Sequence, residues 1–210
     1  MKGKSRFGLP VAAVLLPAVV FAGCGVRYPR NYVLNLTAPP PVLEAPPNAV
    51  PGPLSIREFR CPDYLADGRI VYRPSPEEVG FYEYHRWAVS PTEAITELIT
   101  GTVRARSLFQ RVATHERGTE AAYLLSGKIE QLEEVDSGRE VRAVCTISAE
   151  LRDVRTGQIV WSHTASEMVP VEKRNVAGVV SSLSAAAQTA VDRLVESMRD
   201  QLTSGRAALK

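Results

Sequence analysis

Histidines and paired carboxylates are the residues of this sequence best suited to acid–base chemistry, but their spacing does not favour it. The three histidines lie in separate segments, at His85, His115 and His163. The neighbouring glutamates 77–78 and 133–134 fall in a predicted turn and on a predicted strand, where adjacent side chains point to opposite faces. No metalloprotease, nucleophile-elbow or phosphate-loop motif is present. The sequence therefore predicts a protein that is not an enzyme and that binds no metal ion.

The N-terminus has the pattern of a secreted bacterial lipoprotein. Three basic residues precede an apolar run, residues 9–21, that is too short to span a bilayer. The run ends in a sequence that resembles a lipobox, Phe21-Ala22-Gly23-Cys24. We expect residues 1–23 to be a signal peptide and Cys24 to carry a covalent diacylglycerol and an acyl chain such as palmitate, which anchor a protein firmly. The alternative is an ordinary secretory signal that ends near a cysteine.

The predicted processing also indicates where the protein lies and what it avoids. Gly25, rather than an aspartate, follows the cysteine, and this favours the periplasmic side of the outer membrane over the inner membrane. Removal of Lys2, Lys4 and Arg6 lowers the formal net charge of +2 by three, to −1. A chain so close to neutrality has no basic field to attract phosphates, so we expect no nucleic-acid partner.

Two cysteines remain after lipidation, and two states are open for them. Cys61 follows a predicted strand, and Cys145 lies on the apolar face of another. An oxidising periplasm permits a disulfide between them. A buried free thiol at Cys145 would instead behave as a small apolar side chain.

The mature chain divides into a tether, a domain and a tail. Residues 24–53 contain eight prolines and are predicted to form a semi-rigid spacer, in which residues 32–36 could dock as a short strand. Residues 54–204 are predicted to form one periplasmic domain. Residues 205–210 are the predicted C-terminal tail, and Gly205 is expected to end the last helix.

Periodicity within the domain predicts an α+β fold. A capped helix begins at Ser90, with Pro91 in its first turn and Glu93 completing a capping box. An apolar stripe at helical spacing marks a second, long helix. Alternating residues mark the strands. The expected elements are strand 54–60, hairpin 69–87, strands 122–135, 141–152 and 158–168, and the final helix 175–202. We predict a two-layer sandwich, with a mainly antiparallel sheet of four to five strands covered by two amphipathic helices.

The second arm of the hairpin is unusually aromatic. Strict alternation would place Tyr82, Tyr84 and Arg86 on one face, opposite Phe81. Trp87 is expected to be buried. Because tyrosine and arginine are enriched at interfaces, Tyr82, Tyr84 and Arg86 form a candidate partner interface. The alternative is that these aromatic residues only cover a sheet face.

Two segments carry a resemblance to a known family. They are Tyr32-Val33-Leu34 and residues 70–112, IVYRPSPEEVGFYEYHRWAVSPTEAITELITGTVRARSLFQRV. Together with the lipobox, they resemble the ABC-type transport auxiliary lipoprotein family, which includes the paraquat-inducible C lipoprotein. The resemblance implies a non-catalytic accessory of a transporter built around mammalian-cell-entry (MCE) proteins, which moves phospholipid or other hydrophobic molecules across the envelope. It implies an MCE-domain protein and ABC transporter components as partners, and a homo-oligomer by analogy.

Two other readings of the function remain open. The first is an outer-membrane assembly lipoprotein that partners a β-barrel and is similar to the lipopolysaccharide-assembly plug, which also joins a lipid anchor to a small α+β domain. The second is a lipid carrier with an apolar cavity. The small residues Ala185–Ala187 in the last helix favour close packing over such a cavity.

Overall fold

A computed structural model describes residues 28–40, 49–116 and 120–207 of the chain. The predicted signal peptide, the lipobox residues Phe21 to Gly23, the anchor Cys24 and residues 208–210 lie outside the described residues.

Three long strands form the centre of the fold. They are β6 (Tyr123–Asp136), β7 (Val141–Asp153) and β8 (Ile159–Pro170), and they pair antiparallel in chain order. On β7, alternate residues such as Cys145 and Ile147 are fully buried. Helix α3 (Val176–Ala207) packs along the apolar face that this alternation creates. The predicted three-strand meander and the long helix are confirmed, but the helix continues through Gly205, where we expected it to end.

The remaining strands attach mostly to the other edge of β6. Strand β2 (Val50–Ile56) pairs with the start of β6, and β3 (Arg69–Ser75) pairs with its end, both in parallel. Strand β4 (Glu78–Trp87) forms the hairpin with β3, β5 (Phe109–Thr114) runs parallel to β2, and β1 (Arg30–Tyr32) runs parallel to β4. The α+β class is therefore confirmed. The prediction of a mainly antiparallel sheet of four to five strands is wrong, because the described strands form a mixed sheet of eight.

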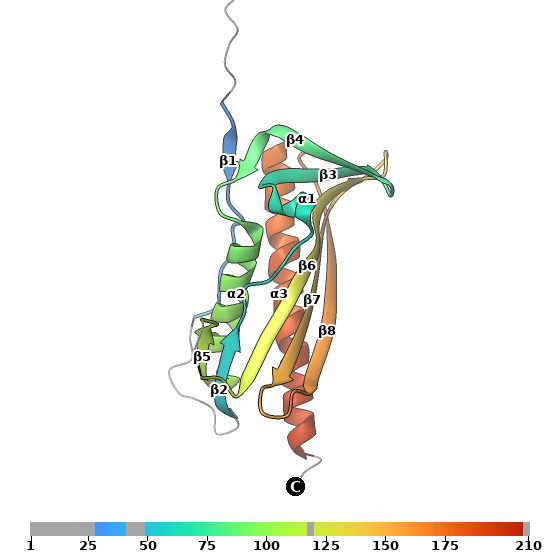
Figure 1. The fold of residues 1–210 in the computed structure, drawn as a ribbon. Coiled ribbons are helices and arrows are strands. Elements are labelled where there is room, and N and C mark those ends of the chain that lie inside the picture. Colours follow the sequence, from blue (N-terminus) through green and yellow to red (C-terminus); the bar gives the residue numbers. More distant parts are fainter. Residues whose placement is uncertain (1–27, 41–48, 117–119, 208–210) are drawn as a thin grey trace, which may run out of the picture.

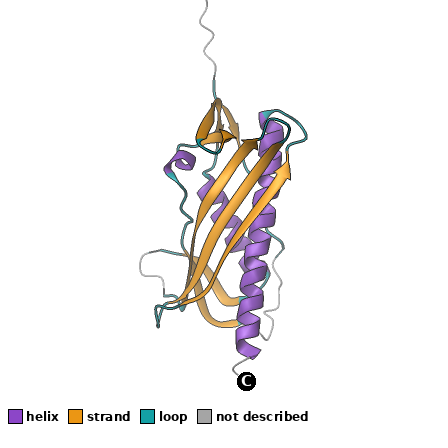
Figure 2. Cartoon of the chain, turned by 90° about the vertical axis from the view of Figure 1, so that its right-hand side faces the viewer, coloured by secondary structure: helices purple, strands orange, loops and turns teal. Residues whose placement is uncertain are grey.

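Helix α3 and the shorter helix α2 (Pro91–Ala105) lie on one side of the three long strands (Figures 1 and 2). Helix α2 packs against α3 and β5, while α1 (Asp63–Ala66) is a single turn before β3. The Ser90 hydroxyl caps α2 as predicted, and it accepts a hydrogen bond from the N–H of Thr92. None of the helices in the described ranges is long and apolar enough to cross a membrane.

The N-terminal segment is part of the folded unit. The strand expected at residues 32–36 lies instead at β1, and the chain then runs on along α3. The N–H of Asn35 donates to Ser184 Oγ at 3.0 Å, and the N–H of Thr37 donates to Gln188 Oε1 at 3.0 Å. Ala38 lies against Gly101 of α2, where a Cβ would come within 2.5 Å of the alanine methyl group. Residues 30–38 and 50–53, predicted within the tether, therefore belong to the domain.

Strand β2 also differs from its prediction. It begins at Val50 and ends at Ile56, four residues earlier at each end than the expected strand at 54–60. Phe59, just after β2, is buried against Gly127 of β6, where a Cβ would lie 2.2 Å from the Phe59 ring. A side chain on Gly127 would therefore separate this segment from the sheet.

Candidate functional site

The hairpin β3–β4 brings several aromatic rings together near β1. Arg69 pairs with Arg86 while Val71 pairs with Phe81, so two steps along β3 match five steps along β4. This irregularity interrupts the alternation of side chains that we predicted for β4. As a result, Tyr82 and His85 share a face, with ring centroids 5.9 Å apart.

The aromatic cluster extends from the hairpin to the N-terminal strand. Tyr32 of β1 donates or accepts a hydrogen bond at His85 Nδ1, at 3.0 Å, and its ring lies 5.5 Å from the imidazole. The ring centroid of Tyr72, on β3, lies 5.1 Å from that of Tyr82. Trp87 is buried, as predicted. The cluster therefore joins β1, β3 and β4 into one unit.

The three residues of the candidate partner interface are not equivalent. Tyr82 is half-buried, and its hydroxyl donates to Glu134 Oε2 at 2.6 Å. Tyr84 and Arg86 are exposed. Their side chains therefore remain candidates for contact with a partner, whereas Tyr82 holds the hairpin to β6.

A buried ion pair fixes the opposite face of the hairpin. Arg73 of β3 donates to both carboxylate oxygens of Glu133, at 2.6 and 3.0 Å, and also to the carbonyl of Pro76 at 3.1 Å. The Glu133 side chain is fully buried, and Gln131 donates to it at 3.3 Å. Such a two-point contact fixes geometry as well as charge. The hairpin is thus held by adjacent glutamates on the two faces of β6.

The two glutamates differ in their surroundings. Burial raises the pKa of Glu134, and the Tyr82 hydroxyl partly offsets this effect. Burial also raises the pKa of Tyr82, as does its hydrogen bond to Glu134. Around Glu133, the hydrogen bond to its carboxylate raises the pKa of Arg73. Neither glutamate faces the other, so the pair is a structural clamp and not an acid–base dyad.

An apolar hollow of about 920 Å³ lies beside this clamp, on the sheet face opposite the helices. Val144 forms part of its lining and is buried, while Met168 leaves most of its side chain exposed. The hairpin contributes two prolines to the lining, and the β6–β7 turn contributes Ser137 and Gly138. Its apolar lining consists of Pro74, Pro76, Val135, Val144 and Met168, and Arg73 and Arg142 are among the polar residues that line it.

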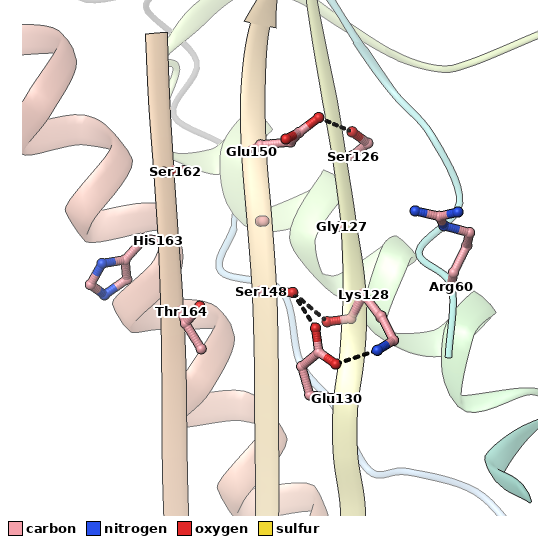
Figure 3. Close-up of a pocket in the computed structure, with 11 residues that line it drawn as sticks. Arg60, Ser126, Gly127, Lys128, Glu130, Ser148, Glu150, Ser162, His163 and Thr164 are labelled. Atoms are coloured by element: carbon pink, nitrogen blue, oxygen red, sulfur yellow. Dashed lines mark hydrogen bonds and ion pairs between the residues drawn. The ribbon is translucent and has the colours of Figure 1, made fainter. Parts of the chain in front are cut away.

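A second hollow, of about 680 Å³, is polar and lies further along the same strands (Figure 3). Two of its hydroxyl groups are engaged with carboxylates: Ser148 donates to Glu130 at 2.8 Å, and Ser126 donates to Glu150 at 3.4 Å. Lys128 also binds Glu130, and this hydrogen bond lowers the pKa of the glutamate. One side of the hollow therefore carries a network of hydrogen bonds between serine, lysine and glutamate side chains.

The histidines do not complete a catalytic arrangement with these groups. His163 projects from the other side of β8, away from Ser148, and its ring lies 6.4 Å from Trp161 (Figure 3). His115 contacts Ser55 at 3.0 Å, near the far end of the sheet. Across residues 28–40, 49–116 and 120–207, no group of His, Cys, Asp and Glu could hold a metal ion.

The disulfide that the sequence left open between Cys61 and Cys145 is not formed, and both cysteines are free. Cys145 is fully buried among apolar side chains under α3, and burial raises its pKa to about 12. Cys61 is half-buried, and its pKa is also raised, first by burial and then by the nearby Asp63 and Glu58. Neither environment favours a reactive thiolate.

The family model for the ABC-type transport auxiliary lipoprotein component matches residues 32–195. The chain belongs to this family. The match starts inside β1 and ends within α3, so it includes the N-terminal segment that docks on the helices as well as the hairpin clamp. A comparison with curated proteins finds no match.

Solved structures share the fold of this family member. A protein from Xanthomonas campestris is 18% identical, with 85% of this chain and 99% of that chain covered and a TM-score of 0.72. An uncharacterised protein is 14% identical, with 81% and 99% covered and a TM-score of 0.63. A PelC dodecamer from Paraburkholderia phytofirmans is 19% identical, with 76% and 93% covered, but its TM-score of 0.47 is too low to support an argument.

Sequence reasoning missed the partners of the clamp. The sequence places Arg73 in a hairpin arm and Glu133 and Glu134 on a predicted strand, and it names no partner for any of the three. The signal that could have found them was a pair of adjacent carboxylates on a long central strand, where one of two neighbouring side chains must face the apolar side, since buried carboxylates need partners. It would not have named Arg73 or Tyr82, which lie 60 and 52 residues away along the chain.

Proposed function

We propose that this family member is a lipid-anchored, non-catalytic accessory subunit of an ABC transport system that contains an MCE-domain protein. It acts on the periplasmic side of the envelope, at the outer membrane. The system moves phospholipid or another hydrophobic molecule between the membranes. The match of the family model over residues 32–195 carries this proposal.

The side-chain chemistry supports an accessory role over a catalytic one. The buried polar groups around the hairpin are paired with one another, and two hydroxyl groups in the polar hollow, those of Ser126 and Ser148, donate to carboxylates. Ser148 has a carboxylate beside it, but the hydrogen bond from Lys128 lowers the pKa of Glu130 and makes it a weaker base for activating a hydroxyl group. The proposed work of the domain is therefore to present a rigid surface to other subunits.

The anchor proposed at Cys24 gives this surface a fixed place in the envelope. Acyl chains on Cys24 would hold the domain to the membrane firmly, since each buried CH₂ contributes about 0.8 kcal/mol. A subunit of this kind can attach a transport conduit to one membrane without entering the bilayer itself.

The proposal is tested by isolating the tagged, full-length protein from envelopes in mild detergent and identifying its partners by mass spectrometry. We expect an MCE-domain protein and ABC transporter components in the eluate. The matched control is Cys24→Ala, which removes the lipid and should release the protein from the membrane and from these partners. Recovery of an outer-membrane β-barrel without an MCE-domain protein would overturn the proposal in favour of an assembly lipoprotein.

A further inference from the structure

The anchor and the folded domain are separated by very little chain. Docking of residues 30–38 leaves only residues 25–27 between Cys24 and the described part of the chain at Tyr28. Fully extended, four residue steps span at most about 14 Å. The end of the domain that carries β1 must therefore stay close to the membrane that holds Cys24. A free spacer of 30 residues could hold a domain tens of ångströms from a membrane, but a connection of three residues is too short for that.

The two ends of the domain are far apart. Helix α3 has 32 residues and is therefore about 48 Å long. It begins near the end that carries β1 and the hairpin, and it finishes near the opposite end (Figure 1). The start of β8, at Ile159, lies beside Ser197 and Gln201 in the last part of α3. That end is out of reach of the membrane when β1 is held close to it.

Exposed apolar side chains gather next to the short connection. Tyr28 is 81% exposed and Val33 is 54% exposed, on either side of β1. Tyr84 and Val89, 38% and 40% exposed, lie just before and just after the part of β4 that pairs with β1. The N–H of Ala88 donates to the carbonyl of Tyr32 at 2.7 Å, so Val33 and Val89 follow directly on paired residues. We call Tyr28, Val33, Tyr84 and Val89 the anchor-side patch.

The chemistry of this patch suits the surface of a bilayer. Tyrosine places an apolar ring and a polar hydroxyl at the level of the lipid headgroups. Arg30 and Arg86 are exposed beside the patch, and Glu83 is the acidic residue next to Tyr84. Long basic side chains can reach anionic headgroups while their stems contact apolar atoms. The anchor-side patch, together with the two arginines beside it, therefore matches the interfacial layer of a phospholipid leaflet.

We propose that the anchor-side patch rests on the phospholipid surface of the leaflet that holds Cys24, with β2, β5 and the end of α3 directed away from the membrane. This inference rests on the lipid anchor in the proposed function. It assigns Tyr84 and Arg86 to the membrane rather than to a protein partner. It also fixes which end of the domain is available to other subunits: the end formed by β2, β5 and the C-terminal part of α3.

Quenching of added tryptophans by brominated lipid tests this orientation. The lipidated full-length protein is placed in vesicles of phosphatidylethanolamine and phosphatidylglycerol, with or without bromine on the acyl chains. Tyr84→Trp and Val89→Trp report on the patch, and Ile159→Trp, at a side chain that is 50% exposed, is the matched control at the far end. The native Trp87 and Trp161 are buried, so the unsubstituted protein supplies the background to subtract.

We expect brominated lipid to quench the added fluorescence of Tyr84→Trp and Val89→Trp, and to leave that of Ile159→Trp unchanged. Adding Cys24→Ser to Tyr84→Trp should abolish the quenching, because the short connection then no longer holds the patch on the bilayer. Protein that floats with the vesicles but shows quenching at Ile159→Trp, or at none of the three positions, would overturn the orientation and leave the anchor intact. Protein that does not float with the vesicles would overturn the anchor itself, and this proposal with it.

Discussion

Glu133 and Glu134 are adjacent residues that the fold places in opposite environments. Glu133 is fully buried and receives two hydrogen bonds from the Arg73 guanidinium. Glu134 receives a single hydrogen bond from a neutral hydroxyl, that of Tyr82, and burial raises its pKa. Removing the charge should therefore have a different effect at each position.

Glu133→Gln should destabilise the domain, whereas Glu134→Gln should not. The first change leaves a mostly buried arginine without its carboxylate, at a cost of about 2–3 kcal/mol in the free energy of unfolding. The second keeps an acceptor for Tyr82 and should change stability by less than about 1 kcal/mol at neutral pH. Urea unfolding measures both, with the exposed Glu97→Gln in the middle of α2 as a control that should be nearly neutral. Equal losses at positions 133 and 134 would contradict this description of the clamp.

The pH dependence of Glu134→Gln follows from the raised pKa of the native residue. In the folded protein Glu134 binds its proton more tightly than in the unfolded chain, so its stabilising contribution is complete below its ordinary pKa of 4.5. That contribution is lost as pH rises through the folded-state pKa. Glutamine does not titrate, so the stability of Glu134→Gln relative to the native protein should increase from pH 4.5 towards neutrality. A constant difference across this range would contradict the raised pKa.

The two free cysteines should differ in reactivity. Cys145 is buried with a pKa of about 12, so a thiol reagent at pH 8 should modify it only after unfolding. The half-buried Cys61 should react slowly in the native state. Counting modified thiols with and without denaturant, in the absence of reductant, checks both statements. A count of zero in denaturant would instead reveal a disulfide.

At the scale of elements, the N-terminal segment is held by side chains of α3. The amides of Asn35 and Thr37 donate to the side chains of Ser184 and Gln188, and residues 34 and 36 pack against the core. Parallel pairing of β1 with β4 continues the attachment at one end, and contact of Ala38 with Gly101 continues it at the other.

The double variant Ser184→Ala, Gln188→Ala should loosen this segment while the sheet stays intact. Each lost hydrogen bond contributes about 0.5–1.5 kcal/mol, so the amides of residues 35 and 37 should exchange with solvent up to about tenfold faster. Hydrogen exchange followed by mass spectrometry measures this change. Thr189→Ala is the control on the same helix, since the Thr189 hydroxyl donates only to the carbonyl of Ala185. Faster exchange throughout β6–β8 would show that the two side chains support the whole domain.

At the scale of the whole molecule, the folded unit is larger than the domain predicted at residues 54–204. It includes β1, the segment along α3 and the first half of β2. The mixed sheet therefore depends on strands that lie before and after residues 39–47, which hold five of the eight prolines.

A chain that starts at residue 54 should be much less stable than one that starts at residue 28. Deletion of residues 28–53 removes the buried Val50 and the packing of Leu34 and Leu36. Full burial of an aliphatic side chain contributes about 1.5–3 kcal/mol; Val50 is buried, and Leu34 and Leu36 are partly buried, so the loss is a large part of the total stability of a typical domain. Thermal unfolding followed by circular dichroism compares the two chains. An unchanged midpoint would show that the N-terminal segment is a dispensable tether.

The sequence by itself was sufficient for the features that depend on neighbouring residues. Alternation in residues 141–152 predicted β7, the apolar stripe predicted α3, and Ser90 with Pro91 predicted the start of α2. The likeness of residues 70–112 to a known family was also visible, and the family match confirms it. These features are local, because each is fixed by side-chain periodicity or by a cap within a few residues.

Only the tertiary structure decided how distant segments meet. Parallel pairing of β2 and β3 with opposite ends of β6 has no local signal, because the strands that pair are far apart in the chain. Simple alternation along β4 would place Tyr82 on the same face as Tyr84. The irregular register between β3 and β4 interrupts this alternation, and Tyr82 shares a face with His85 instead. The proline-rich composition of residues 24–53 indicated a spacer, yet the backbone amides of residues 35 and 37 found acceptors on α3. Burial and hydrogen bonding with remote side chains determined these outcomes, and they place the folded domain next to its proposed anchor.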